Sequence, residues 1–297
     1  MSSSAPLASP LRAGGAATPV ARGPGRLMRG RGWNPRPALV LGSVALLSAA
    51  TALLQGLVLR LYPRGWTVLP RLLSRAVTFL VGMRVTVEGA PAEGPVLFVA
   101  NHISWLDIPL LGSRTRAAFI AKKEIEGWGG MGVMARRYRS VFVDRARRHA
   151  SAAQRDEILE RLKAGDSLVL FAEGTSTDGT RVAPFKSALF AVAQALPDLK
   201  VQPVSIAYTH INGIPVTRAW RPVLGWFGDM ELPGHVWRVL SLGRIRAVIR
   251  FHPPLSMRTA GSRKALATRC RAAVAAGLEA ANAGRMAPTA PAVTPEK

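Results

Sequence analysis

Short apolar runs alternate with segments of helical pattern from Arg84 onward, and this alternation constrains the fold more than any other feature of the chain. An apolar run bounded by residues such as Pro, Gly and Asn is typical of a buried strand. The run Val96–Ala100, between Pro95 and Asn101, is the clearest example. The predicted strands are Val85–Val87, Val96–Ala100, Ala118–Ala121, Ser140–Val143, Ser167–Ala172, Val201–Tyr208 and Ile245–Phe251.

Helical patterns fill most of the intervals between these strands. They follow Asp107 and cover residues 128–138, 149–164, 185–195 and 263–281. Strands that alternate with helices form α/β domains. We therefore predict an α/β fold with a largely parallel seven-stranded sheet flanked by helices. We expect residues 209–240, where three tryptophans occur among Gly and Pro, to form a long irregular insertion near the substrate cleft or the membrane.

The end of the strand Val96–Ala100 carries the strongest chemical signal. His102 follows this strand, and Asp107 comes five residues later at the start of a predicted helix. Ligands of open α/β sheets bind beyond the carboxyl ends of the strands. A histidine in such a place can act as a general base when a carboxylate fixes its tautomer and stabilises the imidazolium. The spacing therefore indicates His102 as a base and Asp107 as its orienting acid.

A structural interpretation of the same residues competes with the catalytic one. Ser104 and Asp107 fit the pattern of a capping box, in which Asp107 would only close the start of a helix. Ser104 itself fits a helix cap better than a nucleophile. The stretch Phe171–Thr177 supports catalysis, because it also follows an apolar strand and places an acid, a glycine and hydroxyls at the strand end.

These stretches resemble the motifs of the glycerolipid acyltransferases, typified by 1-acylglycerol-3-phosphate acyltransferase. The resemblance covers residues 84–255 and implies the α/β fold of the glycerol-3-phosphate acyltransferases. Four motifs in the family's order are more specific than any one of them alone. They are Asn101, His102 and Asp107, then Phe142–Arg145, then Phe171–Thr177, and finally a strand with an internal proline, Val201–Val204.

The resemblance also implies roles for individual residues. His102 would remove the proton from the acceptor hydroxyl, Asp107 would orient it, and the acyl group would pass directly without an acyl-enzyme. Arg145 would hold an anionic head group, although its arginine neighbours also fit a solvated charged surface. The implied substrate contacts are Asn101, Arg145, Glu173, Gly174, Thr175 and Ser176.

The third motif departs from the family pattern at one important position. Ser176 stands where relatives that accept a phosphate carry an arginine after Glu-Gly-Thr. Arg181 or Lys186 could supply the missing charge. The longer stretch Glu173–Ser187 also resembles bacterial enzymes that acylate lyso-ornithine lipid. Two acceptors therefore stay open, a lysolipid of the 1-acylglycerol-3-phosphate type and lyso-ornithine lipid.

The charge balance requires an anionic partner. The 297 residues include 40 Lys and Arg but 17 Asp and Glu, which gives a net charge of +23. No recognisable nucleic-acid motif is present, and long apolar runs lie beside the basic ones. Anionic membrane lipids satisfy both features, so we expect them as partners and expect no nucleic acid. The histidines lack metal-ligand spacing and Cys270 is alone, so we expect no metal and no disulfide.

The first part of the chain predicts attachment to a membrane. Residues 1–37 contain no acid and read as a disordered basic arm. Residues 38–59 are apolar enough to cross about 30 Å of hydrocarbon, and residues 66–83 form an amphipathic pattern. We assign 38–83 to a membrane-spanning or re-entrant helix plus an interfacial helix, 84–285 to the acyltransferase domain and 286–297 to a disordered tail.

The basic residues flank the apolar helix on both sides, so the positive-inside rule does not decide its orientation. We expect the cell inner membrane, with the catalytic domain facing the cytoplasm. The predicted function is O-acyl transfer to the free hydroxyl of a lysolipid. Acyl-CoA or acyl-carrier protein would be the co-substrate, with no other cofactor. A non-catalytic membrane-binding protein and a lipid hydrolase that uses His102 with water are the alternatives of another class.

Overall fold

The computed structural model of the chain describes residues 34–62, 65–143 and 150–285. The predicted tail 286–297 and the predicted basic arm up to Trp33 lie outside these residues.

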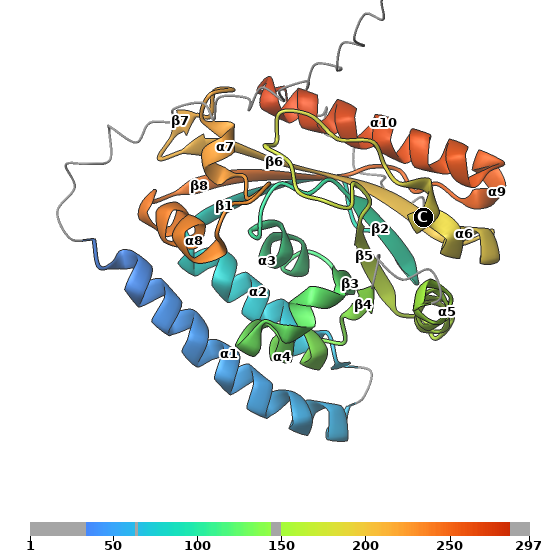
Figure 1. Cartoon of the computed structure of the whole chain (residues 1–297), viewed down its shortest axis with the longest axis horizontal. Helices are drawn as coiled ribbons and strands as arrows, with labels where there is room; N and C mark the ends of the chain where they lie inside the picture. Colours follow the sequence, from blue (N-terminus) through green and yellow to red (C-terminus); the bar gives the residue numbers. More distant parts are fainter. Residues whose placement is uncertain (1–33, 63–64, 144–149, 286–297) are drawn as a thin grey trace, which may run out of the picture. The chain divides into compact units, whose positions relative to one another are not determined.

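Eight strands of the described residues form one sheet. They are β1 Met83–Glu88, β2 Val96–Ala100, β3 Ala117–Lys122, β4 Val141–Val143, β5 Ser167–Phe171, β6 Lys200–Ile211, β7 Ile214–Pro215 and β8 Ile245–Phe251. The order across the sheet is β1-β8-β6-β2-β5-β3-β4, with β7 paired to the end of β6 (Figure 1). The predicted α/β fold is confirmed, each predicted strand is present, and the two-residue β7 is an addition.

The sheet is mixed rather than wholly parallel. Strands β6, β2, β5, β3 and β4 run in one direction, and β8 is antiparallel to β6. Strand β1 is parallel to β8 and is therefore also reversed. As a consequence, the amino ends of β1 and β8 lie at the edge of the sheet where the other strands have their carboxyl ends.

Helices cover both faces of the sheet (Figure 1). In the described residues the α-helices are α1 Arg36–Leu61, α2 Val68–Leu80, α3 Asp107–Gly112, α4 Gly129–Arg137, α5 Ala150–Lys163, α6 Ala191–Ala195, α7 Arg221–Leu224, α8 Leu232–Ser241, α9 Met257–Ala260 and α10 Arg263–Asn282. The 3₁₀ turns include η2 Lys123–Gly127 and η3 Ser187–Phe190. Strand β6 shows how alternate side chains reach the two helical layers. Ser205 Oγ donates to the Val274 carbonyl of α10, whereas Tyr208 reaches Asp107 of α3 from the opposite face.

The predicted irregular insertion 209–240 is wrong over much of its length. It contains the end of β6, the strand β7, and the helices α7 and α8. Two of the prolines that indicated a loop, Pro222 and Pro233, lie in the first turns of α7 and α8. A proline is tolerated there because the first backbone N–H groups of a helix have no partner within the helix.

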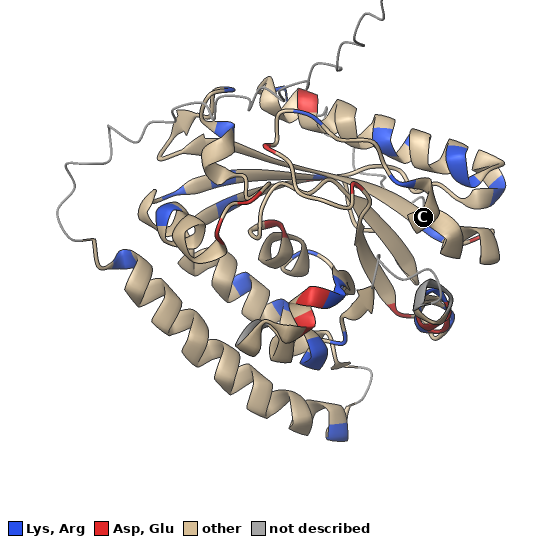
Figure 2. Cartoon of the chain, viewed as in Figure 1, with Lys and Arg blue, Asp and Glu red and all other residues tan. Residues whose placement is uncertain are grey.

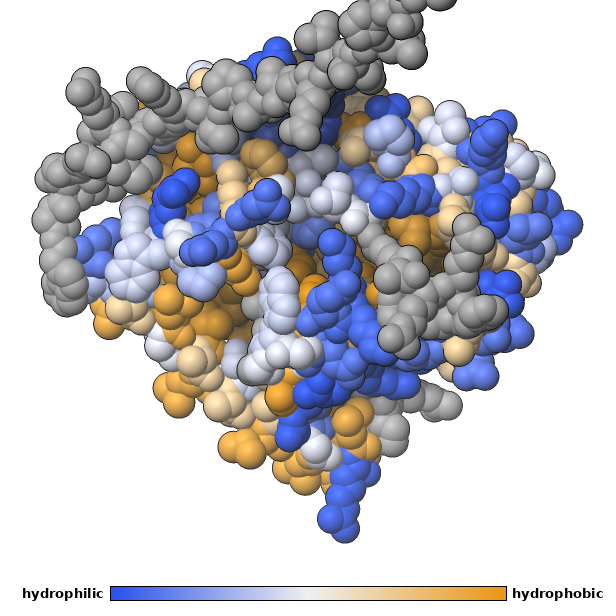
Figure 3. All heavy atoms as spheres, in the orientation of Figure 1, coloured by the Kyte–Doolittle hydropathy of each residue, from blue (hydrophilic) through white to orange (hydrophobic). Residues whose placement is uncertain are grey.

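Helix α1 is long and apolar, and its outer surface is exposed. Between Arg36 and Arg60 it carries no charged residue, so that charge appears only at its ends in Figure 2. By length and composition it is the one described helix that could cross a membrane. The surface over α1, at the lower left of Figure 3, is largely apolar. A long apolar helix with its leucines outward fits association with a membrane.

Side chains at several points fasten α1 to the domain. At its start, Arg36 donates to the carbonyls of Leu240, Val81 and Gly243. Further along, the buried Gln55 donates through Nε2 to the Trp66 carbonyl at 2.9 Å. These polar contacts bring α1 against the domain along its length rather than leaving it to project from one end.

Helix α2 contacts the end of α3 through two arginines. Arg71 and Arg75 each donate through Nε to the carbonyl of Ser113, at 3.5 and 3.4 Å, at the end of α3. Cations are stabilised at that end because the last carbonyls of a helix carry partial negative charge. Leu72 and Phe79 are exposed, the latter at 81%. The outer side of α2 is therefore mostly apolar and also carries the exposed Arg75, a mixture that fits a helix at a membrane interface.

Candidate active site

His102 and Asp107 face each other at the carboxyl end of β2. All five residues of β2 are buried, and the chain leaves the sheet at Asn101. Asp107 is the first residue of α3, and its Oδ2 lies 2.7 Å from His102 Nδ1. Because the carboxylate accepts from Nδ1–H, Nε2 of the ring carries a free lone pair and can accept a proton. This is the geometry of a base and its orienting acid.

The carboxylate of Asp107 is fully buried and accepts three further hydrogen bonds. The backbone N–H groups of Ile103 and Ser104 donate to Oδ2 at 2.6 and 2.9 Å. The hydroxyl of Tyr208 donates to Oδ1 at 2.5 Å. Four donors around one carboxylate fix its position and therefore the orientation of the His102 ring.

Only one of the two hydrogen bonds of a capping box is present, the one from Ser104 N–H to the Asp107 carboxylate. Asp107 does reach back to the loop before its helix, but the Ser104 hydroxyl caps nothing: it is buried and has no hydrogen-bond partner among the described residues. The helix begins after Leu106, with no side-chain cap. The short side chain of an aspartate can bond backbone N–H groups a few residues away, and here that bonding shapes the loop that holds His102.

The ring of His102 is held between the carboxylate and an aromatic side chain. It stacks on Phe171, with ring centroids 4.0 Å apart and planes inclined by 16°. Its side chain is 18% exposed. The backbone carbonyl of His102 accepts from Thr177 N–H at 2.9 Å, which joins the loop to the stretch after β5. The ring is therefore fixed in orientation but open on one side to a substrate.

Glu173 is buried and accepts hydrogen bonds from the backbone of the His102 loop. Its Oε1 accepts from His102 N–H at 2.8 Å and its Oε2 from Ala183 N–H at 2.7 Å. These contacts favour a positioning role over the predicted contact with the acceptor. Burial, above all, raises the pKa of Glu173 to about 7 from its ordinary 4.5.

This raised pKa has a consequence for stability. Glu173 in the unfolded chain ionises near its ordinary pKa, whereas the folded protein keeps the proton up to about pH 7. The folded state therefore binds more protons across that window, and stability falls as pH rises through it, by on the order of 1–3 kcal/mol. Glu173→Gln cannot ionise and should lose this part of the pH dependence. Denaturant unfolding of both proteins at pH 5 and pH 7.5 gives the change in the free energy of unfolding between the two pH values. The same change in the wild type and in Glu173→Gln would contradict the assignment.

The other predicted contacts fall into two groups. Gly174, Thr175 and Ser176 form the turn after β5, where Gly174 has a φ of +75° that favours glycine. Thr175 is exposed, and the Ser176 hydroxyl donates to the Trp226 carbonyl. Asn101, by contrast, is buried. Its Nδ2 donates to the Ile206 carbonyl and its Oδ1 accepts from Ile206 N–H, at 3.0 and 2.8 Å, so its side chain extends the pairing of β2 with β6.

Arg145 lies outside the described residues, so its predicted contact with a head group rests on the sequence. The residues that the structure describes include no group of three or more His, Cys, Asp or Glu placed to hold a metal ion.

The sequence analysis missed the supporting roles of three residues. Trp105 donates through Nε1 to His235 Nδ1 at 3.2 Å, which ties the His102 loop to α8. Burial lowers the pKa of His235 to about 4, so this histidine is a neutral acceptor. Tyr208 lies inside an apolar strand and no local pattern joins it to Asp107. A lone tyrosine in a buried strand does signal that its hydroxyl needs a partner.

The bond from Tyr208 predicts a positioning effect. Tyr208→Phe keeps the ring but removes one donor to a buried carboxylate, a contact of about 1.5–3 kcal/mol. We expect the free energy of unfolding to fall by about that amount. We also expect kcat to fall about tenfold with little change in KM, because the substrate does not touch the hydroxyl. A purely structural role would leave kcat of the folded variant at the wild-type value.

Comparison with known proteins finds similar sequences and a similar fold. The family model described as Acyltransferase matches residues 83–207. The lyso-ornithine lipid O-acyltransferase of Brucella abortus is 42% identical over 260 residues, which cover 85% of this chain and 97% of that protein. The 1-acyl-sn-glycerol-3-phosphate acyltransferase of Neisseria gonorrhoeae is 31% identical over 171 residues, 58% of this chain and 64% of that one. The crystal structure of the 1-acyl-sn-glycerophosphate acyltransferase of Thermotoga maritima has the same fold, with a TM-score of 0.53 and 23% identity over 84% of this chain and all of that chain.

Proposed function

The chain belongs to the acyltransferase family and is an O-acyltransferase of lysolipids, and from this premise we propose that its acceptor is lyso-ornithine lipid. The observation that carries the proposal is the extent of the similarity to the Brucella enzyme, which spans almost the whole of both proteins. The similarity to the Neisseria enzyme is lower and covers little more than half of this chain. Membership of this family favours acyl transfer over the hydrolase and the non-catalytic alternatives.

Position 176 supports the same acceptor. An arginine there would pair with a phosphate through two parallel hydrogen bonds. Ser176 has no charge, and its hydroxyl is bonded to the Trp226 carbonyl. An ornithine head group joined to its acyl chain through the α-amine carries one free amine and a carboxylate but no phosphate, so the arginine that relatives use for a phosphate is not required. The 1-acylglycerol-3-phosphate acceptor, which stood first from the sequence, is the second candidate.

The mechanism we propose uses His102 as the base. Its Nε2 accepts the proton of the acceptor hydroxyl as the oxygen attacks the thioester carbonyl carbon. The carbon–sulfur bond of the resulting tetrahedral intermediate then breaks, and the imidazolium returns the proton to the sulfur. Asp107 stabilises the imidazolium while it exists. The buried Ser104 hydroxyl has no opening to a substrate, which fits direct transfer without an acyl-enzyme.

The placement of α1 and α2 supports a proposal for the membrane. Both helices expose apolar side chains, and α1 is fastened to the domain at its start and in its second half. We infer that residues 38–83 lie in one leaflet and return, so that the acyltransferase domain 84–285 meets the bilayer at the cytoplasmic face of the inner membrane. Acyl-CoA and acyl-carrier protein, both made on that side, are the proposed donors.

An acceptor panel tests the function. Membranes that contain the full chain are incubated with labelled acyl-CoA or acyl-carrier protein and with lyso-ornithine lipid, 1-acylglycerol-3-phosphate or lysophosphatidylcholine. We expect the label in ornithine lipid. Label in phosphatidic acid alone would overturn the proposed acceptor and leave the family assignment intact.

Ser176→Arg tests whether residue 176 contributes to the choice of acceptor head group. The new guanidinium should favour a phosphate head group, so the ratio of kcat/KM for 1-acylglycerol-3-phosphate to that for lyso-ornithine lipid should rise by about tenfold or more. Ser176→Ala is the matched control, because it breaks the same bond to Trp226 without adding charge. An unchanged ratio in Ser176→Arg would mean that this position does not contact the head group.

A further inference from the structure

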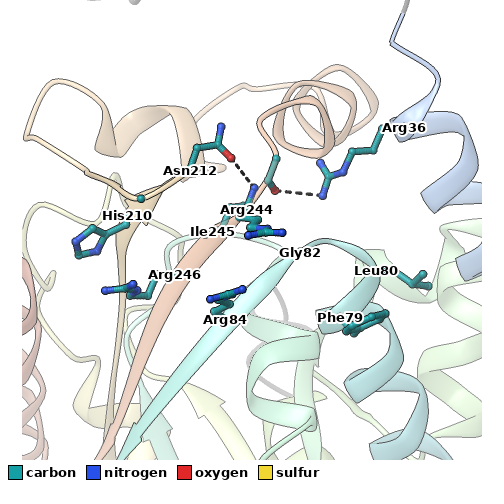
Figure 4. A pocket seen from close by; sticks show the side chains of 12 residues that line it. Arg36, Phe79, Leu80, Gly82, Arg84, His210, Asn212, Arg244, Ile245 and Arg246 are labelled. Carbon is teal, nitrogen blue, oxygen red and sulfur yellow. Dashed lines mark hydrogen bonds between the residues drawn. The ribbon is translucent and has the colours of Figure 1, made fainter.

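A pocket of about 740 Å³ lies away from His102, where β1, β8 and the end of β6 meet the ends of α1 and α2 (Figure 4). Its polar lining includes Arg84, His210, Arg244 and Arg246, and none of its lining residues is acidic. Phe79, which is 81% exposed, lies on the side formed by α2. The pocket therefore combines unneutralised positive charge with an exposed apolar side chain.

Basic side chains form a row across three neighbouring strands of this pocket. Arg84 of β1 is the partner of Arg246 in β8, and Arg246 is in turn the partner of His210 in β6. Neighbouring strands are about 4.8 Å apart, and like charges directly opposite each other destabilise a sheet. Figure 4 shows the three side chains next to one another. An arrangement that costs stability in the free protein is stabilised when an anion binds between the charges.

Strands β1 and β8 pair an acid with an arginine at another position. Four residues on, Glu88 of β1 is the partner of Arg250 in β8, and the two form an ion pair. The side chains of Arg84, Arg244 and Arg246 have no hydrogen-bond or ion-pair partner among the described residues. Strand β1 thus places an acid opposite Arg250 of β8 but an arginine opposite Arg246. Arg36, which also lines the pocket, differs because its guanidinium is occupied by backbone carbonyls.

This row lies on the opposite face of the sheet from the candidate active site. Tyr208, which reaches Asp107, is the partner of Ala247, so the side chain of Arg246 points to the other face. An irregularity between Tyr208 and His210 brings His210 to the face of Arg246. The pocket is therefore separate from the place where the acceptor hydroxyl meets His102.

We propose that this pocket binds the phosphate of an anionic membrane phospholipid. Guanidinium groups pair with phosphate oxygens through parallel charge-assisted hydrogen bonds, and Arg84, Arg244 and Arg246 all line this pocket. The pocket lies at the ends of α1 and α2, whose exposed apolar side chains fit the hydrocarbon of a bilayer, and Phe79 lies beside the arginines. Apolar and basic groups side by side are the arrangement that suits the boundary between acyl chains and anionic head groups. This lipid is a ligand of the protein and not its substrate.

Calorimetric titration of the detergent-solubilised full chain tests the proposal without turnover. The probes are dihexanoylphosphatidylglycerol, the zwitterionic dihexanoylphosphatidylcholine, CoA and inorganic phosphate. The wild-type protein should bind phosphatidylglycerol at least about tenfold more tightly than phosphatidylcholine, and Arg84→Gln/Arg246→Gln should lose at least about tenfold of that affinity. The control Lys264→Gln/Arg285→Gln removes the same charge from exposed positions in and just after α10, and it should bind within about twofold of the wild type.

The outcomes separate the possible ligands. The pocket variant should keep the wild-type Tm or exceed it, since it relieves the repulsion between two arginines. Equal phosphatidylglycerol affinity in the pocket variant and the wild type would overturn the proposal. Loss of CoA binding in that variant without loss of phosphatidylglycerol binding would overturn it in favour of the acyl donor. His102→Ala should bind phosphatidylglycerol like the wild type, so a failure of the proposed function would leave this test unaffected.

Discussion

His102→Ala is expected to lower kcat for acyl transfer by about 10²–10⁴-fold, the usual contribution of a general base. The imidazole Nε2 is the group placed to take the proton, and the alanine variant leaves the buried Asp107 without access to the acceptor. Transfer from labelled acyl thioester to lyso-ornithine lipid measures the effect. KM should change less than kcat, because the ring contacts the reacting hydroxyl and not the rest of the lipid.

Folding of this variant must be checked separately. The His102 ring is partly exposed and stacks on Phe171, so a small decrease in Tm is expected rather than unfolding. A kcat equal to that of the wild type would remove His102 as the base. Release of free fatty acid in place of lipid product by the wild-type protein would instead point to a hydrolase.

Asp107→Asn is expected to damage both stability and catalysis. Four donors converge on the carboxylate, and an amide presents its own N–H₂ group to some of them. We expect a loss of about 2–4 kcal/mol in the free energy of unfolding, because buried donors are left without an acceptor. We also expect kcat to fall by about 10²-fold or more, since the amide cannot stabilise the imidazolium or hold the ring in the same tautomer.

Denaturant unfolding and steady-state kinetics at a temperature where the variant is folded separate the two effects. Tyr208→Phe is the matched comparison, because it removes one of the four donors and keeps the carboxylate. The effect of Asp107→Asn on kcat should exceed that of Tyr208→Phe by about tenfold or more. Equal effects would mean that the charge of Asp107 is not used.

The features that could be predicted from the sequence are those that depend on residues close together in the chain. A strand of five buried residues reveals itself as an apolar run, and each predicted strand appears in the sheet. His102 and Asp107 are five residues apart on one loop, so their pairing depends on local geometry. The family could also be recognised, because its motifs are short and ordered.

Features that join distant parts of the chain could not be predicted in the same way. The direction of β8 relative to β6 depends on how the whole segment between them packs, and the helix α8 within it was hidden by loop-like Pro233 and Gly234. The family resemblance implied that Glu173 contacts the substrate. Only the packed loops show that both of its oxygens accept backbone N–H groups.

The strands, the apolar helix α1 and the pair His102 and Asp107 are local features, because each arises from the periodicity or spacing of neighbouring residues. The hydrogen bond from Tyr208 to Asp107 and the pairing of Arg84 with Arg246 arise only when the chain is folded. The physical reason is that the order and direction of strands follow from the burial of the whole sheet, and residues more than a hundred positions apart meet only once that burial is complete.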